Sequence, residues 1–176
     1  MPPRAPAPMT VTRPELLIDG SDAVFRKLIH ASFGFLARHE AVRASFGQRI
    51  GLSGVEYTVL VAIGHLTAGG GTVIISQLAA HLHLSGAFVT TTTSRLAKKG
   101  LITKDVDPED RRKICLNLTE QAWSTLADLA PIQQQVNDIE FAPLSAGELP
   151  RIVALFENLI DSSEKALKLQ EFLKEH

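Results

Sequence analysis

The chain has 176 residues, of which 45% are hydrophobic and 21% charged, and it contains one cysteine. This length supports one sizeable hydrophobic core, so we expect one domain or slightly more. A net charge of -1 argues against indiscriminate nucleic-acid binding. Apolar runs are too short for a membrane span and the N-terminus lacks a signal-peptide core, so we expect a cytoplasmic protein without a membrane partner.

The N-terminal part divides into an arm and a first helix. Residues 1–14 are rich in Pro and Ala with two arginines and predict a disordered arm. The favoured interpretation is that this arm makes no functional contact. Contact with DNA or with a partner subunit is the alternative. Residues 15–52 are the first dimerisation helix region, with apolar residues at helical spacing over Ser21–Gly47. Ser53 is predicted to cap a second helix, and a glycine-rich loop and short strand follow over residues 69–75.

A helix-turn-helix is predicted within a winged domain that spans residues 53–118. Ser76 is expected to cap its first helix, and His83 to Ser85 form the turn. Ser85 is predicted to cap the second helix. That helix runs to Gly100, which suits the left-handed position that ends many helices.

Two strands and a charged turn complete this unit. Leu101–Val106 and Lys113–Leu118 have the β-branched and apolar residues of strands, and the polar segment Asp107–Arg112 is the turn between them. The order predicts a winged helix, whose second helix can enter the major groove of DNA. The expected fold class is mostly α with a small β-hairpin wing. Residues 119–176 are predicted to contain a long connecting helix followed by C-terminal dimerisation helices. Thr119 is predicted to cap the connecting helix.

The second helix of the unit has two predicted faces. Val89, Thr92 or Thr93, and Leu96 fall on one side and should pack on the first helix. The other side is the candidate DNA-reading surface, consisting of Ala87, Thr90, Thr91, Ser94 and Arg95. Small hydroxyl residues there permit close approach and offer hydrogen bonds or a methyl group to bases. The alternative is an ordinary solvated helix surface.

Several segments together resemble one family. The chain resembles the multiple-antibiotic-resistance regulator (MarR) family in three segments: Leu84–Ile102, Asp107–Arg112 and Leu118–Glu120. The resemblance implies that Arg112 enters the minor groove from the wing and that Asp110 orients it.

The proposed DNA-binding set has further members, and one part of the helix departs from the family. The set also includes Ser85, Arg111 and Lys113. Gly86 and Thr91 are smaller than the residues that relatives often have, which predicts weaker hydrogen bonding in the major groove.

Charge is distributed unevenly along the chain. Residues 76–119 hold seven basic residues, Arg95, Lys98, Lys99, Lys104, Arg111, Arg112 and Lys113, against four acidic ones, Asp105, Asp107, Glu109 and Asp110. After residue 119 acidic residues dominate. A local cationic face predicts phosphate binding that weakens as salt rises.

Dimerisation is expected on two grounds. The apolar stripes of the first and last helices exceed what a small winged domain can cover, and such stripes are usually buried against another copy. Two recognition helices related by a two-fold axis can also read a palindromic operator in double-stranded DNA. The resemblance implies the same homodimer, acting by default as a repressor. The alternative is a monomer whose last helix folds back over its own stripe.

The resemblance also implies a small-molecule effector, typically phenolic or an aromatic acid, bound between the dimerisation and DNA-binding lobes. An aromatic wall with a cation or imidazole suits such a ligand. Candidate residues are His30, Phe33, Phe35, His39, Arg43, Tyr57, His65 and Trp123. Each aromatic residue also has an ordinary interpretation as part of the core.

Other functional classes receive less support. Cys115 in an apolar strand predicts a small buried side chain rather than a thiol sensor. No structural-zinc spacing occurs and no cofactor is expected, although a metal-responsive regulator using His65, His81 or His83 stays open. The sequence lacks the phosphate-loop, nucleophile-elbow and metalloprotease motifs, so no enzyme is predicted. A winged helix that contacts only proteins is the remaining alternative.

Overall fold

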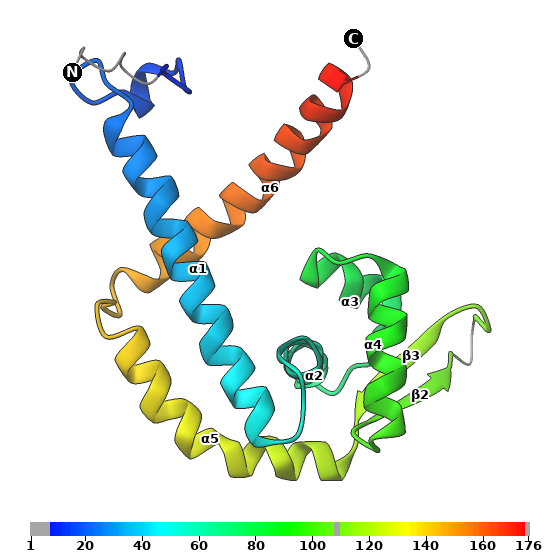
Figure 1. Cartoon of the computed structure of the whole chain (residues 1–176). Helices are drawn as coiled ribbons and strands as arrows, with labels where there is room; N and C mark the ends of the chain where they lie inside the picture. The colour runs from blue at the N-terminus through cyan, green and yellow to red at the C-terminus, as the bar shows by residue number, and fades with distance from the viewer. Residues whose placement is uncertain (1–7, 108–109, 175–176) are drawn as a thin grey trace, which may run out of the picture. The chain divides into compact units, whose positions relative to one another are not determined.

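The computed structural model describes residues 8–107 and 110–174. Over these residues the protein is mostly helical with a small three-stranded sheet (Figure 1), which confirms the predicted fold class. The predicted N-terminal arm includes residues 1–7, which lie outside the described part. Contacts divide the chain into two compact units, Met1–Leu129 and Ala130–His176.

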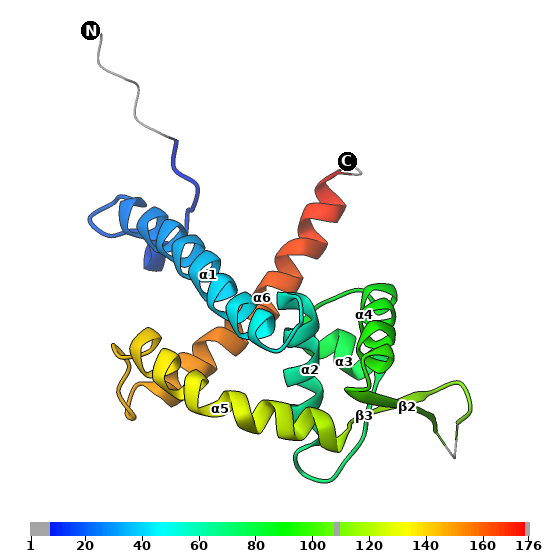
Figure 2. The same ribbon diagram turned by 60° about the horizontal axis from the view of Figure 1, so that its bottom comes forward.

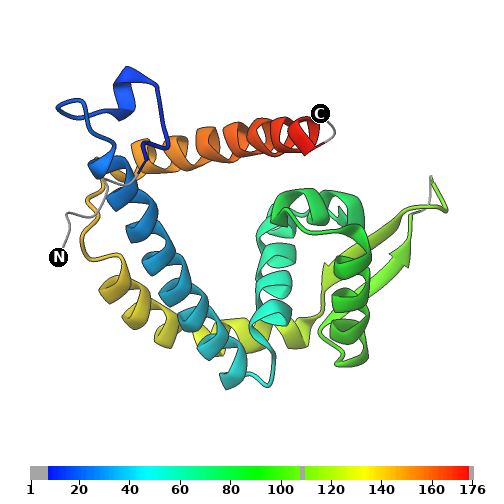
Figure 3. The same ribbon diagram turned by 45° about the horizontal axis from the view of Figure 1, so that its top comes forward.

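The first unit begins with the short 3-10 helix η1 (Pro14–Leu16). α1 (Ala23–Arg49) and α2 (Gly54–Thr67) follow, and their axes are bent by 86° (Figure 3). Ser53 caps α2 as predicted, because its Oγ accepts from the amide of Glu56 at 3.2 Å while the Glu56 carboxylate accepts from the Ser53 amide at 2.9 Å. α2 therefore starts at a fixed point beside the end of α1.

The helix-turn-helix consists of α3 (Ile75–Leu82) and α4 (Gly86–Lys98). Ser85 caps α4 as predicted, since its Oγ accepts from the amide of Phe88 at 3.3 Å. Gly100 adopts the left-handed conformation expected after α4, with φ +72°.

The prediction that Ser76 caps α3 is wrong. The helix already begins at Ile75, and the side-chain oxygen of Gln77 accepts from the amide of Ile74 at 3.1 Å. Ser76 is therefore the second helical residue. The preceding strand leads directly into the helix, so a glutamine in the first turn, rather than a serine before it, satisfies the free amide.

The sheet has the order β1-β3-β2, formed by β1 (Val73–Ile74), β2 (Ile102–Val106) and β3 (Ile114–Leu118). Both pairings are antiparallel, and Ile102 lies opposite Leu118. The hairpin of β2 and β3 lies beside α4 and projects away from the helices (Figure 2), as predicted for a wing. Pro108 and Glu109 of the predicted turn lie outside the described residues.

The core of the first unit lies between α2, α3, α4 and the sheet. Leu60, Leu78, Leu96 and Leu116, one from each of these elements, have no solvent exposure. Burying four such side chains favours folding by about 1.5–3 kcal/mol each, before the opposing loss of conformational entropy. This core fixes α4 against the rest of the winged helix.

The connecting helix α5 (Glu120–Glu140) runs from the first unit into the second, and α6 (Leu149–Lys174) follows. Thr119 caps α5 as predicted, since its hydroxyl accepts from the amide of Ala122 at 3.2 Å. None of the described residues of α6 is buried. Within the described part no single helix is long and apolar enough to cross a membrane, and only the bent pair of α1 and α2 passes that test together.

Candidate nucleic-acid interface

The recognition helix α4 has the two faces that its periodicity predicts. Val89, Thr93 and Leu96 are fully buried and Thr92 is 3% exposed. The predicted reading surface lies on the other side, where Ala87, Thr90, Thr91 and Arg95 are exposed and Ser94 is half-buried. Helical spacing alone therefore separates the packing residues from those open to a partner.

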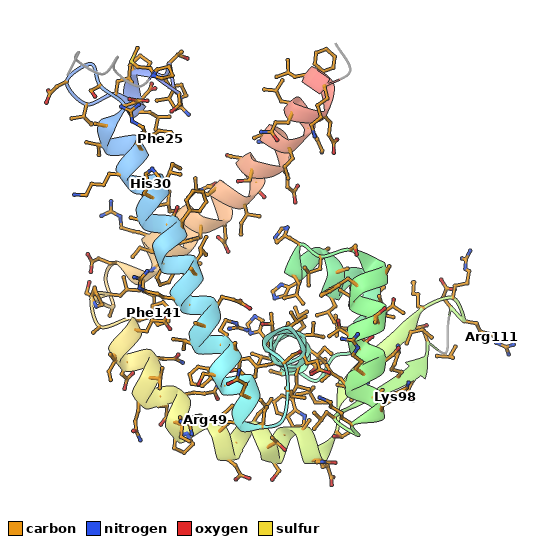
Figure 4. All side chains as sticks on the ribbon, viewed as in Figure 1. Phe25, His30, Arg49, Lys98, Arg111 and Phe141 are labelled. Carbon is orange, nitrogen blue, oxygen red and sulfur yellow. The ribbon has the colours of Figure 1, made fainter. Side chains whose placement is uncertain are left out.

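The wing places a cation on a short tether. The Oδ1 atom of Asp110 accepts from the backbone amide of Arg112 at 3.1 Å and from its Nε at 3.2 Å. The Arg112 side chain is nevertheless 92% exposed. Lys113 lies 3.8 Å from the same carboxylate, and Arg111 stands at the outer end of the hairpin (Figure 4). The expected contact between Asp110 and Arg112 forms, and it restrains the arginine without covering it.

Asp107 supports the base of this turn. Its Oδ1 atom accepts from the Asp110 amide at 2.9 Å, and its Oδ2 atom accepts from the thiol of Cys115 at 3.5 Å. Cys115 is 7% exposed, which confirms the expected buried side chain. Two carboxylates in series thus connect the second wing strand to the arginine.

A hollow of about 340 Å³ brings parts of the predicted DNA-binding set together. Its lining includes Gly86 and Thr90 from the start of α4 and Arg112 and Lys113 from the wing, with Ser76 from α3. Wing and recognition helix therefore share one continuous concave surface, open to solvent and flanked by positive charge.

Two lysines that were not assigned to the site help to position it. Lys104 of β2 donates to Ser94 Oγ at 3.1 Å and to Thr93 Oγ1 at 3.4 Å, which joins the wing to α4. Residues two apart on a strand share a face. Because apolar Ile102 is expected to face the core, its position two residues before Lys104 indicates that Lys104 lies on the side of the helix as well.

Lys99 joins the end of α4 to the start of α2. Its Nζ donates to Glu56 Oε2 at 3.1 Å and to the carbonyl of Gly51 at 3.0 Å. Burial acts to raise the pKa of Glu56, but the Ser53 amide and the Lys99 ammonium outweigh it and hold that pKa below its ordinary value. The glutamate is therefore an anion at neutral pH and an anchor for the recognition helix.

Four of the predicted effector residues form two contacting pairs on α1 and α2. The rings of Phe35 and His39 stack with centroids 5.6 Å apart. One turn further along α1, the Arg43 guanidinium lies 5.4 Å from the ring centroid of Tyr57 and donates to Thr58 Oγ1 at 3.3 Å. Tyr57 is 2% exposed, so Phe35, at 39%, and His39 are the aromatic side chains of this set that solvent reaches, one turn from Arg43.

The other predicted effector residues lie elsewhere. His30 is exposed on the projecting part of α1 (Figure 4), and Phe33 is 63% exposed on a different side of that helix from Phe35. His65 stacks on His81 with ring centroids 6.0 Å apart. Trp123 lies against Gly64, at the start of α5. Among the described residues no three His, Cys, Asp or Glu side chains form a group that could hold a metal ion.

Comparison with known sequences identifies the central segment. Residues 52–114 match the model of the MarR family. The chain is 36% identical over 72 residues to the HTH-type transcriptional repressor NicR of Pseudomonas putida, a match that covers 41% of this chain and 46% of NicR. It is 29% identical over 84 residues to a putative transcriptional regulatory protein for the hcr operon of Thauera aromatica, covering 48% and 51% of the two chains. The chain thus spans about half the length of these curated relatives.

Solved structures share the fold over a longer stretch. A probable transcriptional regulator from Pseudomonas aeruginosa is 26% identical with a TM-score of 0.54, covering 72% of this chain and 95% of that one. A mutant MarR from E. coli complexed with operator DNA has a TM-score of 0.61 at 17% identity, with coverage of 78% and 94%. Bordetella bronchiseptica BpsR, described for the regulation of its DNA binding by 6-hydroxynicotinic acid, has a TM-score of 0.60 at 23% identity, with coverage of 75% and 91%.

Proposed function

We propose that the protein is a dimeric repressor that binds a palindromic operator in double-stranded DNA, because residues 52–114 match the model of the MarR family and the elements from α2 to β3 have the order of a winged helix. α4 enters the major groove and the wing enters the adjacent minor groove, with Arg112 as the inserted side chain. Asp110 holds this arginine for insertion. Transcription is blocked because the bound dimer covers the promoter.

The observation that carries this proposal is the exposed but tethered Arg112 beside the open face of α4. Its side chain is 92% exposed while Asp110 restrains it through two hydrogen bonds. Restraint lowers the conformational entropy that an arginine loses on binding, and exposure leaves the guanidinium available to the negative potential of a narrow minor groove. The open face of α4 beside Arg112 distinguishes this site from an ordinary surface ion pair.

The decisive experiment is charge reversal at the wing. We expect Arg112→Glu to reduce binding to duplexes selected from a random pool by at least about a hundredfold, since it removes an attraction and adds a repulsion to phosphate. Lys168→Glu on α6 is the matched control because it makes the same change of charge on an exposed residue outside the winged unit. Binding is measured by fluorescence anisotropy at fixed salt, and assembly by sedimentation.

Two results would contradict the proposal. If the wild-type protein enriches no duplex, the winged helix serves protein contacts instead. If Arg112→Glu and Lys168→Glu reduce binding equally, the wing is not the contact surface.

The proposed dimer is supported by apolar side chains that the chain itself leaves exposed. On α6 these include Val153, Phe156, Leu159 and Ile160, which are 41% to 52% exposed. On α1, Leu28 and Phe33 are 61% and 63% exposed. Soluble proteins rarely leave such stripes uncovered, and a second copy supplies a matching surface.

We further propose that an aromatic acid releases the operator by binding beside Arg43. The stacked and partly exposed Phe35 and His39 rings provide an aromatic surface one turn before Arg43 on α1. Arg43, which lies over the buried Tyr57 ring, can pair with a carboxylate. The regulation of DNA binding of BpsR by 6-hydroxynicotinic acid supports this ligand class. A ligand that binds the DNA-incompetent form more tightly by a few kcal/mol is sufficient for release.

The effector proposal is tested with 6-hydroxynicotinic acid and benzoic acid. A ligand at a hundred times its dissociation constant stabilises the protein by about 2.7 kcal/mol, so the melting temperature should rise and operator DNA should dissociate. Arg43→Gln should abolish both effects. Arg38→Gln is the control, because Arg38 lies on α1 but donates to Gly34 of its own helix. The proposal is overturned if both acids leave the melting temperature unchanged. It is also overturned if the Arg43→Gln and Arg38→Gln variants respond equally.

A further inference from the structure

The hydroxyl groups on the open face of α4 are committed to the helix itself. Thr90 Oγ1 donates to the Gly86 carbonyl at 2.8 Å, and Thr91 Oγ1 donates to the Ala87 carbonyl at 3.1 Å. A hydroxyl has one hydrogen to donate. While these bonds persist, Thr90 and Thr91 can accept hydrogen bonds from DNA but cannot donate to it.

Ser94, one turn further, is occupied on both sides. Its Oγ donates to the Thr90 carbonyl at 2.8 Å and accepts from Lys104 Nζ at 3.1 Å. This serine therefore joins the wing to the helix rather than presenting a free polar group. Direct readout by small side chains is thereby confined to the first two turns of α4, at Ala87, Thr90 and Thr91.

The bonded hydroxyls also fix where the methyl groups lie. Oγ1 and Cγ2 of threonine are both attached to Cβ, so holding Oγ1 against a carbonyl fixes the rotamer and with it the methyl. Thr90 and Thr91 are exposed, and so is Ala87. At these three positions the surface offered to a major groove thus consists of methyl groups and hydrogen-bond acceptors, whereas Arg95, one turn after Thr91, is a donor on the same exposed side.

An A·T pair is the complement of such a surface. In the major groove it presents the thymine C5 methyl and the adenine N6 amino donor. A G·C pair presents the cytosine N4 amino donor and two guanine acceptors but has no methyl group, so methyl contact is what distinguishes the A·T pair. We propose that Ala87, Thr90 and Thr91 select A·T pairs in each half-site through contact with thymine methyl groups. This inference rests on the proposed DNA binding and specifies which bases the recognition helix reads.

The test removes the methyl groups from the DNA. The most enriched palindrome selected with the full chain is resynthesised with deoxyuridine in place of thymidine, which deletes the C5 methyl and keeps base pairing and O4. We expect binding to weaken by about fourfold for each contacted thymine, the value for burying one methyl-sized group. Deoxyuridine that is tolerated at every position overturns the inference and leaves DNA binding itself intact.

Protein variants locate the contact. Thr91→Ser keeps the hydroxyl and removes the methyl, and should weaken binding to thymine duplexes about as much as deoxyuridine does, with little further loss when both changes are combined. Thr91→Val keeps a methyl and removes the hydroxyl, and should preserve binding. Thr125→Ser is the matched control, because Thr125 makes the same hydroxyl bond to Gln121 on α5.

The outcomes separate the inference from its premise. Equal loss with Thr91→Ser and Thr91→Val would show that the hydroxyl, not the methyl, is read. A selected palindrome of G·C pairs opposite the first turns of α4 would also overturn it. Failure to enrich any duplex would remove the proposed function and this inference together, and the deoxyuridine measurement does not depend on whether a variant folds.

Discussion

In α4 the side chains of Val89, Thr93 and Leu96 are completely buried, whereas no described residue of α6 is buried. Both helices are amphipathic, and α6 has the larger number of big apolar side chains in solvent, with Phe156 and Leu159 50% and 52% exposed. The winged helix therefore obtains its stability within one copy of the chain. The apolar stripe of α6 is stabilising only when another surface covers it.

The largest expected effect comes from a charge in the α6 stripe. Leu159→Asp should place an unpaired carboxylate in the proposed dimer interface of both copies, at a cost of about 3 kcal/mol or more for each. We expect sedimentation to show a monomer while the near-UV spectrum of the winged unit is retained. A stable dimer with Leu159→Asp would show that α6 is not the interface.

The next largest effect tests the other side of the comparison. Leu96 has no solvent exposure, so Leu96→Ala should reduce the free energy of unfolding by about 2–5 kcal/mol. Urea denaturation measures this loss. Leu167→Ala on α6 is the control, since Leu167 is 60% exposed. In contrast to Leu96→Ala, its effect should depend on protein concentration if α6 forms the proposed dimer interface.

A smaller effect is expected where α4 is anchored to α2. Lys99→Met removes the hydrogen bonds to Glu56 and Gly51 but keeps the aliphatic stem. The lysine side chain is 39% exposed, so solvent screening limits the expected loss to about 1 kcal/mol. Lys98→Met, on an exposed neighbour, should change thermal stability less. Equal effects from the two variants would contradict the anchoring role.

The smallest effect is a pH dependence that arises from Glu56. Its pKa in the folded protein lies below the ordinary value of 4.5, so the folded state binds this proton less tightly than the unfolded state. The stability that it contributes is therefore complete above pH 4.5 and is lost as the pH falls through the folded pKa. Glu56→Gln should flatten the acid limb of stability measured between about pH 6 and about pH 3. An unchanged acid limb would exclude this contribution.

Much of the local structure could be predicted because the interactions that determine it are local. The caps at Ser53, Ser85 and Thr119 each act within three residues of themselves, and the buried face of α4 follows from helical period. Ser76 was assigned wrongly as a cap because sequence pattern does not show where a strand ends and a helix takes over. The pairing of Asp110 with Arg112 spans two residues and was expected from the family resemblance.

The sequence by itself therefore determined the order of elements, the two faces of α4 and the charged wing, since period, capping and turn chemistry operate between near neighbours. Tertiary structure alone decided that Lys104 reaches Ser94, that Lys99 reaches Glu56 and that Arg43 lies over Tyr57. Lys104 and Ser94 are 10 residues apart in the chain, and Lys99 and Glu56 are 43 residues apart. Packing of the core brings such elements together, and a short-range sequence pattern does not identify the residue that a side chain contacts on another element.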